Sequence, residues 1–213
     1  MEDIIKNISY CGTVFLLINV IVFLKSFARE GRAFKIFTFY LIAVAVTQVL
    51  TTIWVFLKTN NLGFSNIYLV SQFVLLSLFY FELIRKRIIL FILVTVSLFL
   101  AYQYISDNAS IYEYNSIGLS ITQVLIIAYS ITYLFRSIQG GSVFLMINIG
   151  IFFYLICSTL IFASGELQFQ LPPKGYLLLL LLNAIFYMLF QLIIFYEWYK
   201  NYRIPVKSDL EVE

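Results

Sequence analysis

Histidine is absent from the sequence, and this absence excludes several enzyme classes at once. Histidine is the commonest general base, proton shuttle and metal ligand, so serine–histidine hydrolysis and zinc proteolysis of the HExxH type are ruled out. Aspartyl intramembrane proteolysis needs aspartates within helices, yet Asp3, Asp107 and Asp209 lie in tails or loops between apolar runs. We therefore expect no enzyme, no catalytic residue, no metal site and no cofactor.

Cysteine is also scarce, and the basic residues are dispersed. Cys11 and Cys157 lie inside apolar segments without a paired spacing, which predicts neither a disulfide framework nor a zinc site; we interpret both as small core residues. The net charge is +3, but the basic residues lie between apolar runs rather than on one surface, so we expect no nucleic-acid partner. The segment 176–199 has no lysine, which excludes a retinal Schiff base there.

Charge is the third shortage, and it indicates a membrane protein. Only 12% of the 213 residues are charged and 62% are hydrophobic, a balance that cannot cover a water-soluble surface. Seven apolar runs are each close to the length that crosses a bilayer as a helix, and they lack the alternation of barrel strands. The runs are 4–24, 34–57, 65–84, 88–105, 112–135, 143–164 and 176–199. The sequence predicts an all-α, polytopic bundle of seven transmembrane helices in contact with the lipid bilayer.

The distribution of basic residues between the connections predicts the orientation of the helices, because cytoplasmic loops keep lysine and arginine. One set of connections holds eleven basic residues, namely Lys25, Arg29, Arg32, Lys35, Arg85, Lys86, Arg87, Arg136, Lys200, Arg203 and Lys207. The opposite set holds Lys6, Lys58 and Lys174. We therefore expect the N-terminus outside and the C-terminus in the cytoplasm. Residues 1–200 form one transmembrane domain in this interpretation, and residues 201–213 form a short disordered tail.

Two carboxylates fall near helix ends on the predicted cytoplasmic side. Glu82 precedes the Arg85-Lys86-Arg87 cluster, and Glu197 lies close to Lys200. Interfacial charge costs much less than charge at the bilayer midplane, so we favour interfacial ion pairing and anchoring over a proton-coupling role. The three basic residues are candidates for contact with a cytoplasmic protein partner or with anionic lipid.

Uncharged polar side chains recur within the apolar runs and are the candidate ligand-binding residues. They are Asn19, Gln48, Tyr68, Gln72, Gln123 and Asn183. Such side chains could line a small polar cavity open to the outside, suited to a neutral or zwitterionic ligand. The favoured alternative is that they hydrogen-bond between helices. The many tyrosines near helix ends, such as Tyr102 and Tyr196, indicate an interfacial belt rather than an aromatic ligand cage.

The stretches 60–84 (NNLGFSNIYLVSQFVLLSLFYFELI) and 180–200 (LLLNAIFYMLFQLIIFYEWYK) resemble a group of small, uncharacterised seven-helix proteins of the bacterial inner membrane. In that group the third helix opens with histidine-isoleucine-tyrosine followed by a glutamate, and the seventh helix carries an asparagine. Ile67, Tyr68 and Asn183 fit this pattern, whereas Asn66 and Gln72 replace the histidine and the glutamate. The resemblance implies a bacterial inner-membrane location and brings no established activity.

Two functional hypotheses from different classes remain open. The first is a sensory or interaction protein that is not an enzyme, binds a small ligand or lipid and acts through a separate cytoplasmic partner. The second is a transporter or channel for a small neutral solute, although broken helices, repeats and a midplane carboxylate are not evident. An intramembrane lipid enzyme, or an accessory protein of a defence or secretion system, ranks below both.

Overall fold

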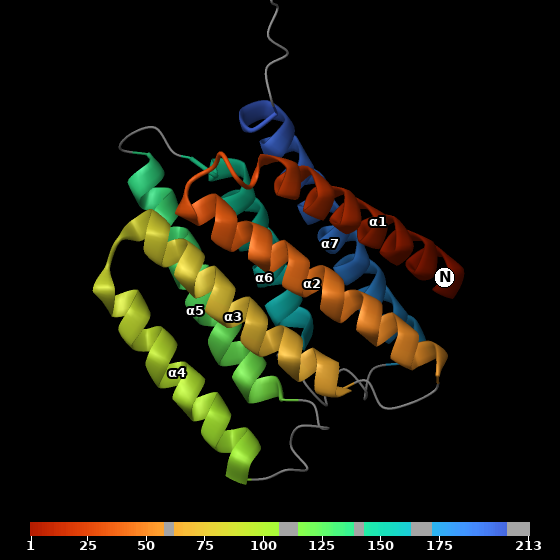
Figure 1. The fold of residues 1–213 in the computed structure, drawn as a ribbon. Helices are drawn as coiled ribbons and strands as arrows, with labels where there is room; N and C mark the ends of the chain where they lie inside the picture. Colours follow the sequence, from red (N-terminus) through yellow and green to blue (C-terminus); the bar gives the residue numbers. More distant parts are fainter. Residues whose placement is uncertain (58–61, 107–114, 139–142, 163–171, 204–213) are drawn as a thin grey trace, which may run out of the picture.

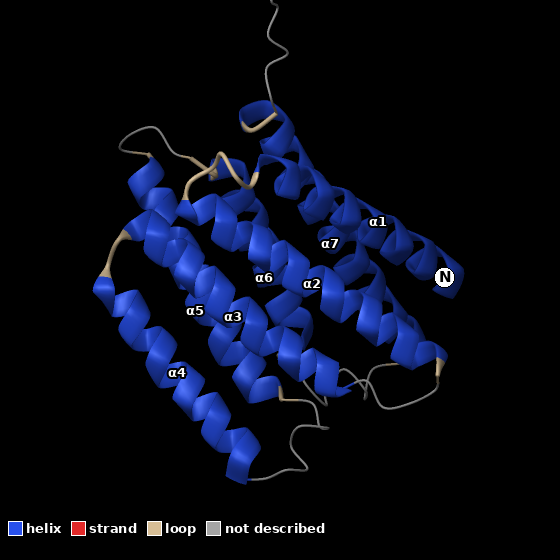
Figure 2. Cartoon of the chain, in the orientation of Figure 1, coloured by secondary structure: helices blue, strands red, loops and turns tan. Residues whose placement is uncertain are grey.

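The computed structural model describes residues 1–57, 62–106, 115–138, 143–162 and 172–203, and these residues form seven helices and no strand (Figure 2). The helices are α1 (Glu2–Ser26), α2 (Arg32–Phe56), α3 (Leu62–Ile84), α4 (Arg87–Ser106), α5 (Ser116–Ser137), α6 (Leu145–Phe162) and α7 (Pro173–Asn201). Each helix overlaps one of the seven apolar runs, which confirms the all-α prediction. The tail from residue 204 onward lies outside the described residues.

Some helix boundaries differ from the boundaries of the apolar runs, because the local capping residues determine where the helix begins or ends. Helix α5 begins at Ser116 rather than near 112, because Asn115 is its N-cap and the Asn115 side chain accepts a hydrogen bond from the Gly118 amide at 2.7 Å. Helix α3 ends at Ile84, and Arg85 takes the left-handed conformation with φ of 58°. This conformation reverses the chain, so Arg85 and Lys86 alone connect α3 to α4.

Neighbouring helices pack along their lengths in a bundle whose edges are α4 and the α1–α7 pair (Figure 1). Helix α2 packs on α3, α6 packs on both α5 and α7, and α4 contacts chiefly α3. Helices α1, α3, α5 and α7 finish at one end of the bundle, which also holds Arg85, Lys86 and Arg87. We call this the basic end, and we call the end where α1 begins the opposite end.

The outer surface of the bundle is apolar. Exposed side chains include Phe56 at 75%, Ile105 at 78% and Leu160 at 74% of their maximum accessibility. Among the described residues, six helices are long and apolar enough to cross a membrane, and α6 is a shorter apolar helix of 18 residues. Cys11 is exposed on α1, so its interpretation as a core residue is wrong, and Cys157 is half-buried on α6.

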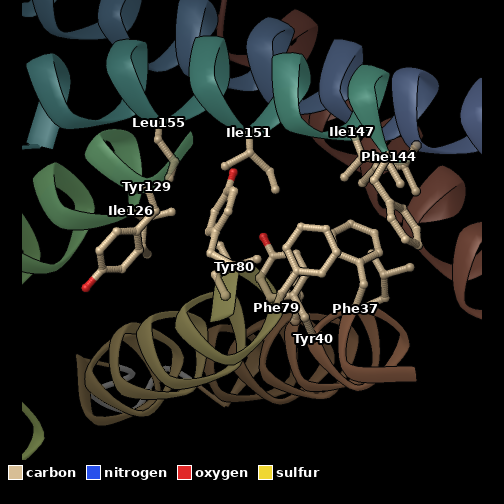
Figure 3. Packing of buried hydrophobic residues seen from close by; sticks show 14 of the residues in the cluster. Phe37, Tyr40, Phe79, Tyr80, Ile126, Tyr129, Phe144, Ile147, Ile151 and Leu155 are labelled. Atoms are coloured by element: carbon tan, nitrogen blue, oxygen red, sulfur yellow. The ribbon is translucent and has the colours of Figure 1, made fainter. Parts of the chain in front are cut away.

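Aromatic and aliphatic side chains fill the interior. Figure 3 shows Phe37 and Tyr40 of α2 and Phe79 and Tyr80 of α3 facing Ile147 and Ile151 of α6. Toward the basic end the packing is mainly aromatic. The Phe23 and Phe34 rings stack with centroids 4.7 Å apart, and the Phe37 and Phe79 rings lie 5.2 Å apart. Offset and edge contacts of this kind stabilise the packing beyond the buried area alone.

Gly150 allows α6 to approach α7 closely. A Cβ atom added at this position would lie 2.8 Å from Cδ2 of Phe190 and 3.2 Å from Cγ2 of Ile193. Phe190 is 2% exposed and packs in a stacked arrangement against Tyr154, with ring centroids 5.3 Å apart. The Phe190 ring therefore has little freedom to move away from an added methyl group.

We predict that Gly150→Ala lowers the free energy of unfolding by about 1 to 3 kcal/mol, because overpacking at Phe190 outweighs the better helix propensity of alanine. Thermal unfolding in detergent measures the change. In the double variant Gly150→Ala/Phe190→Leu the added methyl has room, so we expect a positive coupling between the two changes. Additive losses in the double variant would contradict the proposed contact.

Candidate functional site

Four tyrosines from four helices meet inside the bundle. They are Tyr40 of α2, Tyr68 of α3, Tyr154 of α6 and Tyr187 of α7, joined by Gln72 of α3. The Gln72 amide nitrogen donates to the Tyr68 hydroxyl at 3.0 Å, and Tyr40 interacts with both of these residues. Tyr68 also interacts with Tyr154, whose ring centroid lies 5.9 Å from that of Tyr187. We call these five residues the tyrosine cluster.

Helical spacing places two residues of the cluster, and Asn183 next to it, on common helix faces. Tyr68 and Gln72 are four residues apart on α3, and Asn183 and Tyr187 are four residues apart on α7. Residues at this spacing lie above one another on one side of a helix. Gly12 of α1 leaves space for the α7 ring, since a Cβ atom at that position would lie 2.9 Å from Cδ1 of Tyr187.

Two buried polar atoms at this face of α7 have no hydrogen-bond partner among the described residues. They are the Asn183 side-chain oxygen and the Tyr187 hydroxyl. Leaving a buried donor or acceptor unpaired costs about 1 to 3 kcal/mol, and an apolar environment offers no water as a substitute. The pair therefore presents an acceptor and a hydroxyl that a bound molecule could satisfy.

The other amides predicted to line the same cavity lie in separate helix contacts. The Asn19 nitrogen donates to the Gln191 main-chain and side-chain oxygens at 2.9 and 3.0 Å, which joins α1 to α7. The Gln123 oxygen accepts from the Thr159 hydroxyl at 2.7 Å, which joins α5 to α6. Gln48 is half-buried, and its side chain makes no hydrogen bond to the described residues. Of the predicted set, the structure brings together Tyr68 and Gln72 and places Asn183 beside Tyr187.

A second polar group of residues in the interior was not predicted from the sequence. The Tyr80 hydroxyl donates to the Asn148 side-chain oxygen at 2.6 Å, and the Asn148 nitrogen donates to the Ser130 carbonyl at 3.3 Å. This contact joins α3, α5 and α6. Tyr40, Tyr154 and Tyr187 of the tyrosine cluster were not predicted either. Their positions in the sequence could have identified these three tyrosines as interior residues, because they lie within apolar runs. Belt residues such as Tyr102 lie at helix ends.

The two predicted carboxylates at the basic end have different environments. Glu82 forms an ion pair with Arg85 at 3.2 Å, and the Arg85 side chain is 73% exposed. Arg85, Lys86 and Arg87 are all exposed, as a contact surface requires. Glu197 is 1% exposed and forms no ion pair with a described residue, so the interfacial ion pair expected for it is not present.

Glu197 caps a helix instead of pairing with Lys200. One carboxylate oxygen accepts the Met146 amide at 3.1 Å, in the first turn of α6, and the other accepts the Asn201 side chain at 2.7 Å. Negative charge is favourable at a helix N-terminus, where main-chain N–H groups are free. Nearby, an Arg136 guanidinium nitrogen donates to the Ile84 carbonyl at the end of α3. These two side chains hold helix ends together at the basic end.

We predict that Glu197→Gln lowers the free energy of unfolding by about 1 to 3 kcal/mol, because one amide nitrogen would then face a donor. Glu82→Gln removes an ion pair whose Arg85 side chain is 73% exposed, and this loss is expected to cost about 0 to 1 kcal/mol. Thermal unfolding of both variants in the same detergent gives the comparison. Equal losses, or a larger loss for Glu82→Gln, would contradict the capping role of Glu197.

No protein-family model matches this chain, and no curated protein or solved structure is significantly similar to it.

Proposed function

We propose that the chain is an integral membrane protein that binds a small uncharged molecule at the tyrosine cluster and acts through a separate protein docked at the basic end. The observation that carries the proposal is the unpaired Asn183 oxygen and Tyr187 hydroxyl beside the cluster. A ligand that donates one hydrogen bond and accepts another would satisfy both atoms. An ionised ligand fits poorly, because no charged side chain belongs to the cluster and burying an unpaired charge is costly.

Membrane insertion is supported by the apolar exterior and by the helix lengths. Large apolar side chains are exposed on every helix, and a contiguous surface of this kind is not stable in water. Helix α6 is about 27 Å long at 1.5 Å per residue, close to the hydrocarbon thickness, and it runs between the same two ends as its neighbours. We propose that all seven helices cross the membrane, which agrees with the implied location in a bacterial inner membrane.

The distribution of basic residues supports a cytoplasmic basic end, with the N-terminus outside. Ten of the eleven basic residues in the majority set lie within the described part of the chain, and their helix ends are at the basic end. Lys207 falls outside the described residues. The exposed Arg85, Lys86 and Arg87 would then face the cytoplasm, where an acidic surface of a partner protein could dock.

The orientation is tested with single cysteines in a background where Cys11 and Cys157 are serine. In intact cells, a membrane-impermeant maleimide is expected to label Lys6→Cys but not Lys86→Cys. Lys86→Cys is expected to become labelled once the membrane is permeabilised. Both side chains are exposed; Lys6 lies near the start of α1, and Lys86 lies between α3 and α4. The reverse labelling pattern would contradict the orientation, and labelling of both positions would contradict a seven-fold crossing.

The ligand site is tested by gentle affinity purification of the full chain followed by mass spectrometry of the bound small molecules. We predict a stoichiometric molecule in the wild type, and its loss by tenfold or more in Asn183→Leu and Tyr187→Phe, since each hydrogen bond is worth about a factor of ten in an apolar site. Neither variant is expected to lose stability, because each removes a polar atom that has no partner.

Gln123→Leu is the matched control, since it also replaces a buried amide by an apolar side chain but removes a paired one. It is expected to lose about 0.6 to 2 kcal/mol of stability and to keep the ligand. Retention of the bound molecule by both Asn183→Leu and Tyr187→Phe would contradict the proposed site. Loss of stability in Asn183→Leu comparable to that in Gln123→Leu would show that Asn183 joins helices instead.

A further inference from the structure

A hollow of about 310 Å³ lies between α3 and α4. The described residues that line it are Gly63, Asn66, Ile67, Val70 and Ser71 of α3 and Tyr104 of α4. None of these residues is charged, and none belongs to the tyrosine cluster or to the basic end. The hollow is therefore a separate feature of the bundle.

The hollow exists because α3 and α4 are held together closely at one end only. Arg85 and Lys86 alone connect the two helices, and beside this connection Ile84 and Ile89 are 1% and 2% exposed. Figure 1 shows α3 and α4 meeting there and diverging toward the opposite end. Ile67 lines the hollow and is 54% exposed. The hollow is thus a part of the α3 surface that α4 leaves uncovered.

The chemistry of the lining favours a hydrocarbon occupant. The surface that faces the hollow is mainly apolar, and an ordered water needs two to four polar partners that such a surface does not supply. An ionised group fits poorly as well, because no described residue of the lining carries the opposite charge. Asn66 and Tyr104 already make interactions within the protein; the Tyr104 hydroxyl oxygen accepts from the Asn115 side chain at 3.2 Å.

The position of the hollow along α3 matches the depth of a lipid chain. Its α3 residues run from Gly63 to Ser71, which is about 12 Å of a helix about 35 Å long. Gly63 is the second residue of α3, so this stretch begins where the helix begins and ends before the middle of the span. In the proposed membrane arrangement a molecule with its polar group at the interface would extend a chain inward along this stretch.

We infer that the hollow binds one acyl chain of a phospholipid from the leaflet at the opposite end of the bundle. The chain lies against Ile67, Val70 and Ser71 between α3 and α4, and the headgroup remains at the interface beyond the start of α3. Such a lipid supplies the apolar contacts that α4 does not make with this part of α3. The inference goes beyond the proposed function and needs from it only insertion in a membrane, which the maleimide labelling tests separately.

Native mass spectrometry of the full chain in detergent tests the inference with phosphatidylglycerol, phosphatidylethanolamine and phosphatidylcholine of identical acyl chains. We expect one phospholipid to be retained, and the three to be retained equally, because no charged side chain lines the hollow to select a headgroup. Lysophosphatidylcholine, which has a single chain, is expected to displace the bound lipid. Glycerophosphocholine has the same headgroup and no chain, and it is expected to leave the lipid bound.

Ser71→Leu fills the hollow and is expected to lower retention about tenfold, which corresponds to the loss of roughly two buried methylene groups. The Ser71 hydroxyl makes no hydrogen bond to a described residue, so this change removes none, and thermal unfolding is measured alongside. Val70→Phe fills the same hollow from the neighbouring position and is expected to have the same effect. Thr95→Leu is the matched control, because it places leucine on an exposed face of α4 outside the hollow and is expected to keep the lipid.

Unchanged retention in folded Ser71→Leu and Val70→Phe would overturn the inference, as would displacement by glycerophosphocholine or retention of only one of the three headgroups. A wild-type dimer that Ser71→Leu converts to a monomer would also overturn it, since the hollow would then bind a second copy of the chain. Asn183→Leu is expected to keep the phospholipid, so failure of the tyrosine-cluster ligand and failure of this site are separable.

Discussion

The structure depends on one constraint, which is that every polar group away from water must find its hydrogen-bond partner within the protein. Helices satisfy the main chain, and the apolar exterior leaves polar side chains only the contacts between helices. Several polar side chains of the described interior follow this rule, although six buried side-chain atoms have no partner among the described residues. Asn19 bonds to Gln191 between α1 and α7, and Tyr80 bonds to Asn148 between α3 and α6. Partners of this kind fix which helix faces meet, because a rotated helix would bury its amides without partners.

The same constraint makes the tyrosine cluster unusual. Phenol groups suit an apolar interior, since the ring packs like phenylalanine and the hydroxyl needs a single partner. Tyr68 has that partner in Gln72, but Tyr187 and the adjacent Asn183 have none among the described residues. The Asn19 side-chain oxygen and the Ser77 and Tyr129 hydroxyls are also buried without a partner among the described residues, but Asn183 and Tyr187 place two such atoms on one face of α7. The proposed binding site rests on this pair of atoms, four residues apart on α7.

The sequence was sufficient to predict the helices, because apolar runs and polar connections reflect the transfer of each residue from water to lipid. It was not sufficient for the partners of the polar side chains. Asn19 and Gln191 are 172 residues apart, and no local pattern relates them. The burial of Glu197 was missed because its neighbours Tyr196 and Lys200 indicate an interface, whereas its partner is the first turn of α6. Of the tyrosine cluster, Tyr68 and Gln72 were predicted as ligand-binding candidates, whereas the other three tyrosines were not singled out, although they lie within the apolar runs and not at helix ends.

An experimental density map of the protein purified in native lipid, at a resolution that shows small molecules, tests the account most directly. We expect density that belongs to no protein atom within hydrogen-bonding distance of both the Asn183 oxygen and the Tyr187 hydroxyl. Continuous protein packing at this place, with both atoms bonded to neighbouring helices, would contradict the binding site and leave the tyrosine cluster as a contact that only holds α2, α3, α6 and α7 together.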